Sequence, residues 1–334
     1  MKALQIEDLR RLRLIDVPAP TPRDGEILLR VKYVGFCGSD LNTFRGLNTM
    51  AKSKVVPGHE LGAEICAIGA SVPDHFSIGQ VVTVNPYTHC GVCASCRAGR
   101  YNACEYNETL GVQRDGAMCE YVSLPWQKVI PSQGISVRDS ALIEPMSVGF
   151  HAVARGQVSD TDTVLVIGCG MVGLGAVIRS VHRGATVIAA DIDAHKLEFA
   201  KEVGATYCYN TADEWVDLPS PSVVIEAVGS PATYRMALER VDYCGRVVCI
   251  GYAKADVLLP TGAIVKKEAA VVGSRNATMS DFESVIRILK QGSVPLDRFV
   301  SAVISPSEAQ KSLEGWDAAP GRILRILTQW NIDN

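Results

Sequence analysis

Four closely spaced cysteines are the clearest chemical signal in the sequence. Cys90, Cys93, Cys96 and Cys104 follow the pattern C-x2-C-x2-C-x7-C. This spacing allows one loop to surround a tetrahedral ion, and four thiolates leave no open coordination position, which is typical of a structural zinc site. The sequence therefore predicts a structural zinc lobe over residues 86–108.

Two other classes of metal-binding protein use similar cysteine spacing. The bacterial ferredoxin pattern ends in a three-residue gap and a proline, whereas Glu105 follows Cys104 here. A nucleic-acid zinc finger needs a basic face. In this lobe the positive charges of Arg97 and Arg100 are balanced by the negative charges of Glu105 and Glu108. Structural zinc is the favoured interpretation, with an iron–sulfur cluster as its competitor.

A glycine-rich segment over residues 168–173, GCGMVG, fits the dinucleotide fingerprint G-x-G-x-x-G. It directly follows an apolar strand expected over residues 163–167 and opens a helix, which is the context that the fingerprint requires. Gly168 permits the tight turn, Gly170 lets the backbone approach a pyrophosphate, and Gly173 lets the helix pack closely against the sheet.

The same region predicts how the cofactor is bound and which cofactor it is. Free amide groups at the helix N-terminus, around Met171 and Val172, would bind the phosphates. Asp191 ends the next strand, 21 residues after Gly170, and its carboxylate would accept hydrogen bonds from both adenosine ribose hydroxyls. It would repel a 2′-phosphate, and the neighbouring Ile192 offers no compensating cation. The sequence therefore predicts NAD in preference to NADP.

Three further segments contain residue types that bind metals or move protons. Cys37 is followed by Ser39 in GFCGSD, His59 and Glu60 lie in GHELG, and Glu144 precedes a proline. A single cysteine or histidine of this kind is more often a buried packing residue than a ligand. In this order, and together with the cysteine lobe and the fingerprint, the three segments form a pattern that is specific enough to indicate one family of proteins.

Composition limits the class of protein. The 334 residues suggest about two domains, and 47% hydrophobic with 21% charged residues is ordinary for a globular protein. The net charge of −3 argues against a protein whose main function is to bind nucleic acid. The longest uncharged apolar stretch, 16 residues over 163–178, is too short and too rich in glycine to span a membrane. The first 30 residues mix acids and bases, so we expect no signal peptide, eleven reduced cysteines and a cytoplasmic location.

The expected elements change character along the chain. The first 150 residues or so contain short strands separated by glycine and proline, which indicates a β-barrel-like domain; these strands cover residues 27–34, 62–68, 81–84 and 119–124. Beyond about residue 160, apolar strands alternate with amphipathic helices, the pattern of a doubly wound parallel sheet. Its strands are expected over 163–167, 186–190, 207–209, 223–226, 247–250 and 269–272, and its helices over 171–182, 194–203, 232–241 and 282–290.

Together these segments resemble the zinc-dependent medium-chain dehydrogenase/reductase family, within the alcohol dehydrogenase superfamily. The resemblance covers essentially the whole chain and rests on GFCGSD, GHELG, the four cysteines, the Glu-Pro pair and the fingerprint. It is closest in pattern to the polyol and sugar-acid branch, which includes sorbitol, threonine, galactitol-phosphate and galactonate dehydrogenases. Those enzymes also have Glu-Pro where classical alcohol dehydrogenases have a cysteine ligand.

The resemblance implies an α/β fold of two domains. A GroES-like, β-barrel-type catalytic domain would comprise residues 1–152 and 291–334, and a Rossmann NAD-binding domain would comprise residues 153–290. It further implies a homodimer or homotetramer acting on a small alcohol, polyol or sugar acid, without a nucleic-acid or membrane partner.

The resemblance also implies the catalytic residues. Cys37, His59 and Glu144 would be the ligands of a catalytic zinc, which with the cysteine lobe makes two zinc ions per chain. Glu60 would be a close carboxylate that ligates directly, through water or during ligand exchange, and Ser39 would relay a proton. One thiolate, one imidazole and one carboxylate leave a fourth position for water or substrate. Zinc there would lower the pKa of a substrate hydroxyl, and hydride would pass to NAD⁺.

Further positions follow from the same resemblance. Val228, Gly251 and Ser274 would face the cofactor from the carboxyl ends of strands, where α/β sheets bind ligands. A sugar acid would need a cation for its carboxylate, and Arg45 and Arg275 are candidates.

One position departs from the family pattern. Many members have a histidine five residues after the cysteine ligand, where this chain has Asn42. An asparagine side chain cannot act as a base near neutral pH. We therefore hypothesise that Glu60 or a bound water takes the proton onwards.

Two other functions remain open at this point. One is a reductase of the same fold without catalytic zinc, such as a quinone or enoyl reductase; threonine or an alditol phosphate is an alternative substrate within the favoured branch. The other is a zinc-stabilised binding protein without catalytic activity, which the acidic balance and the complete fingerprint disfavour.

Overall fold

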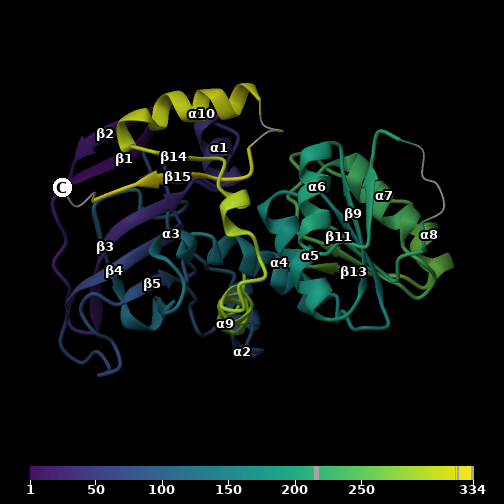
Figure 1. Ribbon diagram of the computed structural model, residues 1–334, viewed down its shortest axis with the longest axis horizontal. Coiled ribbons are helices and arrows are strands. Elements are labelled where there is room, and N and C mark those ends of the chain that lie inside the picture. The colour runs from purple at the N-terminus through teal and green to yellow at the C-terminus, as the bar shows by residue number, and fades with distance from the viewer. Residues whose placement is uncertain (214–217, 320, 322, 332–334) are drawn as a thin grey trace. The chain divides into compact units, whose positions relative to one another are not determined.

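The computed structural model describes residues 1–213, 218–319, 321 and 323–331 (Figure 1). The chain divides into two compact units, one of residues 1–144 with 286–334 and one of residues 145–285. The domain boundaries expected from the sequence, after residues 152 and 290, lie eight and five residues beyond these divisions.

The first unit is built on a mixed sheet of seven strands in the order β14-β15-β3-β4-β5-β7, with β6 pairing β3. The strands are β3 (Glu26–Gly35), β4 (Glu60–Ile68), β5 (Val81–Val84), β6 (Tyr121–Pro125), β7 (Val129–Pro131), β14 (Ala302–Ile304) and β15 (Ile326–Gln329). A separate hairpin joins β1 (Lys2–Asp8) to β2 (Arg11–Asp16). The short helices of this unit are α1 (Gly38–Phe44), α2 (Ala94–Arg97) and α3 (Val137–Ser140).

The end of the chain returns to the first unit. Strand β15 pairs antiparallel with β3, and helix α10 (Ala309–Ala318) contacts β2 and α1. Leu313 and Trp316 of this helix belong to the same buried apolar cluster as Phe36, Leu61 and Ile65. Burial of this apolar surface is what holds the tail against the sheet.

The second unit contains six parallel strands in the order β10-β9-β8-β11-β12-β13. They are β8 (Thr163–Ile167), β9 (Thr186–Asp191), β10 (Tyr207–Asn210), β11 (Val223–Glu226), β12 (Arg246–Cys249) and β13 (Ala270–Gly273). Numbered from β8, this order is 3-2-1-4-5-6, that of a Rossmann sheet, and its strand order reverses between β8 and β11. The predicted doubly wound sheet is therefore confirmed.

Helices α5 (Met171–His182), α6 (Ala194–Glu202), α7 (Pro231–Arg240) and α8 (Thr261–Lys267) connect these strands (Figure 1). The helix starts follow local chemistry: Asp193 caps α6 by accepting hydrogen bonds from the next turn, and Ser230 caps α7 before a first-turn proline. Helices α4 (Ile143–Arg155) and α9 (Met279–Leu289) each contain one of the divisions between the units.

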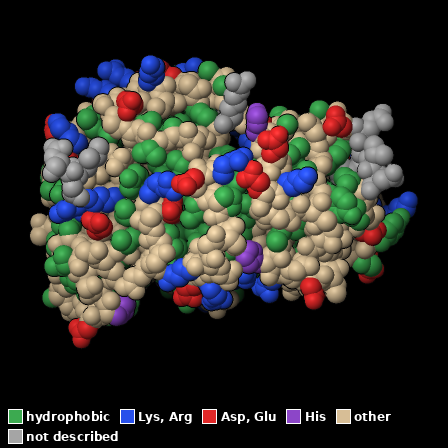
Figure 2. Space-filling model, in the orientation of Figure 1, with side chains coloured by type: hydrophobic (Ala, Val, Ile, Leu, Met, Phe, Trp, Pro, Cys, Tyr) green, Lys and Arg blue, Asp and Glu red, His purple; other side chains and the backbone are tan. Residues whose placement is uncertain are grey.

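Two surface properties bear on function. None of the described helices is long and apolar enough to cross a membrane. On the face drawn in Figure 2, basic and acidic side chains are interspersed, which agrees with the near-neutral charge balance.

Candidate functional site

The cysteine of GFCGSD lies between a strand and a short helix. Cys37 follows β3 and is the N-cap residue of α1. Its amide donates a hydrogen bond of 2.8 Å to Asp40 Oδ2. Asp40 is buried, and burial raises the pKa of its carboxyl to about 6. This reciprocal turn fixes the direction in which Cys37 leaves the sheet.

Strand pairing brings the histidine segment to the same place. In the antiparallel register of β3 and β4, Gly35 lies opposite Glu60. Gly58, directly before His59, has φ of +104°, and a Cβ there would lie 2.8 Å from Val34 Cγ1. A glycine is therefore required at the bend that turns His59 towards the end of β3.

These contacts gather three potential ligands. One ligand atom each of Cys37, His59 and Glu60 lies within 4.8 Å of the other two. Both His59 and Glu60 are buried, and His59 Nδ1 has no hydrogen-bond partner among the described residues. Burial lowers the pKa of His59, but the adjacent Cys37 and nearby carboxylates outweigh it and raise the pKa well above its usual value. A thiolate, an imidazole and a carboxylate that converge on one small space, with a nitrogen unpartnered, fit a zinc ion.

Glu144, expected as the third ligand, is not part of this set. It lies at the start of α4 and is buried, and its Oε1 accepts a hydrogen bond from the Tyr87 hydroxyl. Burial raises the pKa of Glu144 to about 7, although the nearby His59 acts in the opposite direction. The site thus contains two carboxylates, Glu60 within the ligand set and Glu144 beside it.

Arg325, on the segment before β15, is a site residue that the sequence analysis missed. Its Nε lies 3.1 Å from Glu60 Oε2, and both side chains are almost completely buried. The Arg325 guanidinium also donates a hydrogen bond to the Phe36 carbonyl. A Cβ on Gly35 would overlap Glu60 and approach Arg325, so the glycine leaves room for this ion pair. A lone arginine inside the apolar run ILRIL was the available signal.

Two other expected residues differ in their surroundings. The Ser39 hydroxyl is buried and has no hydrogen-bond partner among the described residues, which leaves it free to contact a ligand. Arg45, in contrast, donates hydrogen bonds to the Asp317 side chain and carbonyl. Because Asp317 already supplies a carboxylate, Arg45 is not a free cation for a sugar acid, and Arg275 also has a partner.

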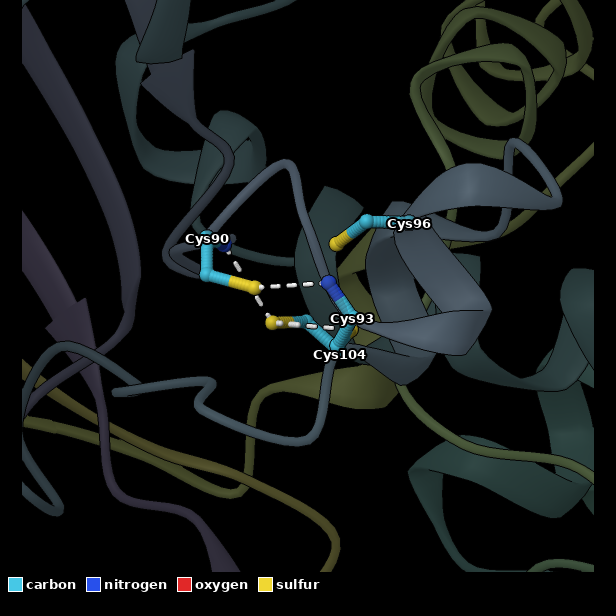
Figure 3. Close-up of side chains that lie close together, drawn as sticks. All are labelled: Cys90, Cys93, Cys96 and Cys104. Carbon is cyan, nitrogen blue, oxygen red and sulfur yellow. Dashed lines mark hydrogen bonds between the residues drawn. The ribbon is translucent and has the colours of Figure 1, made fainter.

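The four lobe cysteines converge as their spacing predicts. The four sulfur atoms all lie within 4.8 Å of one another; they belong to Cys90, Cys93, Cys96 and Cys104. Figure 3 shows these side chains grouped around one loop. Backbone amides donate to Cys90 Sγ, which lowers the pKa of that thiol, and a hydrogen bond from Ser95 lowers the pKa of Cys93 to about 5. All eleven cysteines are free thiols. Burial, in contrast, raises the pKa of the Cys96 thiol to about 11. Four converging cysteines, two of which have a lowered pKa, fit a closed, four-sulfur metal site.

The fingerprint glycines of the second unit have distinct surroundings. Gly168 has φ of +93°, and a Cβ there would lie 2.6 Å from Val228 Cγ2. A Cβ on Gly173 would overlap the Gly168 carbonyl oxygen. Gly170, the N-cap residue of α5, has nothing within 4 Å of its Cβ position. This open space at a helix N-terminus suits a phosphate group.

The acidic residue expected to select the cofactor ends β9. Asp191 accepts hydrogen bonds from the Cys169 amide at 2.7 Å and from the Asp193 amide at 3.0 Å. Its carboxylate is therefore tied to the fingerprint loop, and the exposed Ile192 beside it carries no charge.

The remaining cofactor candidates lie at the carboxyl ends of β11, β12 and β13. Buried Glu226 accepts hydrogen bonds from the Val228 and Gly229 amides at 2.9 and 2.8 Å, and a Cβ on Gly251 would overlap Gly229. The Ser274 amide donates to the Cys249 carbonyl. The turns after β11 and β12 thus pack backbone against backbone at the edge of the sheet where the fingerprint also lies.

Comparison with known proteins places the chain in a family. Residues 23–134 match the alcohol dehydrogenase GroES-like domain, and residues 172–291 match the zinc-binding dehydrogenase family. L-Galactonate-5-dehydrogenase of Escherichia coli K12 is 32% identical over 84% of this chain and 85% of its own length. The chain belongs to the zinc-binding alcohol dehydrogenase family.

Two further relatives cover nearly the whole chain. Sorbitol dehydrogenase of Bacillus subtilis is 33% identical over 94% of this chain and 93% of its own. The crystal structure of an alcohol dehydrogenase from E. coli CFT073, complexed with NADH, is 28% identical, covers 99% of both chains and has a TM-score of 0.89. These comparisons confirm the predicted family and fold class, and with them the prediction of a zinc-dependent dehydrogenase that uses a nicotinamide cofactor.

Two glycine variants separate cofactor binding from folding. We expect Gly170→Ala to weaken NAD binding about 10-fold or more, because the methyl group would fill the space offered to the pyrophosphate, while the unfolding midpoint stays unchanged. Gly173→Ala should instead lower the stability, by about 1–3 kcal/mol, because it overpacks a buried contact. NADH fluorescence titration and urea unfolding of both variants measure this difference. Equal NAD affinity of Gly170→Ala and the unchanged protein would contradict the assignment.

Proposed function

We propose that this protein oxidises a secondary alcohol of a polyol or sugar acid, reversibly, with NAD⁺ as hydride acceptor. The observation that carries the proposal is the convergence of Cys37, His59 and Glu60 in a chain that also has a complete dinucleotide fingerprint. The sorbitol and galactonate dehydrogenases among its relatives support the substrate class. A reductase without catalytic zinc would not need this ligand set.

The arrangement of the acids favours a definite ligand set. We place the catalytic zinc on Cys37, His59 and Glu60, with Glu144 as a second carboxylate beside it. One thiolate and one carboxylate balance the charge of Zn²⁺, so one ligating carboxylate is enough. Glu60 is favoured for that place because its oxygen lies within 4.8 Å of the ligand atoms of Cys37 and His59. The second zinc belongs to the four-cysteine lobe.

Individual residues of this chain have distinct roles in the proposed reaction. Bound zinc would supply a Lewis acid that acidifies the substrate hydroxyl, and NAD⁺ would accept the hydride. The unpartnered Ser39 hydroxyl would accept the substrate proton as it passes its own proton on, and Glu60, paired with Arg325, would take that proton when it exchanges off the metal. Asn42 cannot take this role. Asp191 binds the adenosine ribose and favours NAD over NADP, and Gly168, Gly170, Met171, Val172, Gly173, Val228, Gly251 and Ser274 form the rest of the cofactor site.

The direct test measures NAD⁺ reduction against polyols, aldonates, alditol phosphates and threonine, with metal analysis of the same sample. We expect NADH formation with at least one of these classes, two zinc ions per chain, and loss of activity on chelation that added zinc restores. Full activity with one metal per chain would favour a zinc-free reductase. No NADH with any substrate and no NADH binding would favour a zinc-stabilised binding protein.

A second test concerns the proton route. Glu60→Gln should lower turnover about 100-fold because the proton acceptor is lost, and it should lower zinc content by a smaller factor because Cys37 and His59 still bind the ion. Glu64→Gln, four residues along the same strand and partly exposed, is the matched control and should retain activity. A Glu60→Gln enzyme with an unchanged hydride-transfer rate at every pH would exclude Glu60 from the route.

We also propose that the enzyme is a cytoplasmic homodimer or homotetramer, assembled through the edge of its parallel sheet. Strand β13 is the last in the sheet order, and Ala270 and Val271 on it are exposed. Leu258 and Val265, before this strand, are more than 80% exposed. Apolar side chains along an open strand edge suit pairing with a second copy. The reducing cytoplasm would keep the eleven cysteines available to metals.

One charge on that edge tests the assembly. Val271→Lys should shift the protein from oligomer to monomer in light scattering, because paired edges would bring two lysines together. Val303→Lys, on β14 of the first unit and equally exposed, is the matched control and should leave the oligomer intact. An unchanged mass for Val271→Lys would exclude this edge.

A further inference from the structure

The Tyr87 side chain is buried and binds a carboxylate beside the proposed metal site. It is 4% exposed, and its hydroxyl donates a hydrogen bond to Oε1 of the equally buried Glu144. Glu144 is close enough to His59 and Glu60 for their charges to influence its protonation. The tyrosine hydroxyl therefore holds one of the two carboxylates of the site.

The backbone of Tyr87 is anchored just as firmly. Lys128 Nζ donates to the Tyr87 carbonyl at 2.6 Å, and Arg114 donates to the Pro86 carbonyl at 3.3 Å. The Tyr87 amide donates to Asn85 Oδ1 at 3.1 Å. Two half-buried cations thus hold consecutive carbonyl groups, which leaves the tyrosine ring little freedom to move.

Tyr87 also lies where the four-cysteine lobe closes. The segment that contains Tyr87 leads directly to the first lobe cysteine, Cys90, and the chain returns from the lobe at Thr109, which forms a β-bridge with Tyr87. Next to this bridge, the Leu110 amide donates to the Pro86 carbonyl at 3.0 Å. Both ends of the lobe therefore meet at the residue that holds Glu144.

We propose that Tyr87 is a positioning residue that ties Glu144 to the base of the four-cysteine lobe and keeps it out of the metal's ligand shell. The inference rests on the proposed function, in which Cys37, His59 and Glu60 are the ligands. A buried carboxylate that loses its hydrogen-bond donor needs another partner. Without the Tyr87 hydroxyl, Oε1 of Glu144 would be released towards the metal, which would gain an oxygen ligand and a negative charge.

The test replaces zinc with Co²⁺ and compares Tyr87→Phe with the unchanged enzyme. Four-coordinate cobalt absorbs visible light more strongly than five-coordinate cobalt, so coordination geometry can be read from the spectrum. We expect the bands of the catalytic site to weaken, those of the four-thiolate site to persist, and kcat to fall about 10-fold. Tyr106→Phe, at an exposed tyrosine of the same lobe, is the matched control and should change nothing.

Two more variants distinguish positioning from general loss of structure. Lys128→Met removes an anchor of the Tyr87 backbone without touching Glu144, and should weaken the same cobalt bands to a smaller extent. If Tyr87→Phe fails to fold, Lys128→Met alone tests the inference. If Tyr87 acts through Glu144, the double variant Tyr87→Phe/Glu144→Gln should have the same kcat as Glu144→Gln alone.

The outcomes separate this inference from the proposed function. If the unchanged protein binds cobalt only at the four-thiolate site, the proposed catalytic centre is wrong. If catalytic-site bands are present but identical in Tyr87→Phe and Lys128→Met, the positioning role is wrong. Additive losses in the double variant would also overturn it.

Discussion

The antiparallel register between β3 and β4 is the constraint on which the site depends. Because Gly35 lies opposite Glu60, the end of one strand and the start of the next place Cys37 and His59 side by side, although 21 residues separate them in the chain. A slip of one residue would turn every side chain of a strand to the other face. The buried apolar cluster of this sheet therefore fixes the ligand geometry as well as the fold.

The first unit buries more charge than packing alone would favour. Glu60, Glu144 and Arg325 are almost fully buried, and burying a charge without a partner is costly. Each acid has a dedicated partner, Arg325 for Glu60 and Tyr87 for Glu144. Groups held in this way are preorganised for a cation, which would add the positive charge that two neighbouring acids need.

Much of this architecture could be predicted from the sequence, because local patterns determine it. Alternating apolar strands and helices predicted the parallel sheet, and most of its predicted elements end within three residues of the observed ones. Helix α4 was missed because its first turn contains a proline, and the short helix α10 was also not predicted. The four cysteines converge as their spacing predicts, since a single loop carries them. The apolar run around Arg325 could signal a buried charge, but neither its partner Glu60 nor the role of Tyr87 could be found in this way, because only long-range pairing brings these residues to the metal site.

The most direct measurement is a zinc anomalous-difference map from crystals of the zinc-loaded protein. The account predicts two peaks per chain, one among the sulfur atoms of the cysteine lobe and one in contact with Cys37 Sγ, His59 and Glu60, with Glu144 still bonded to Tyr87. A single peak confined to the lobe, with Cys37 and His59 free of metal, would contradict the central claim that this chain builds a second, open metal centre.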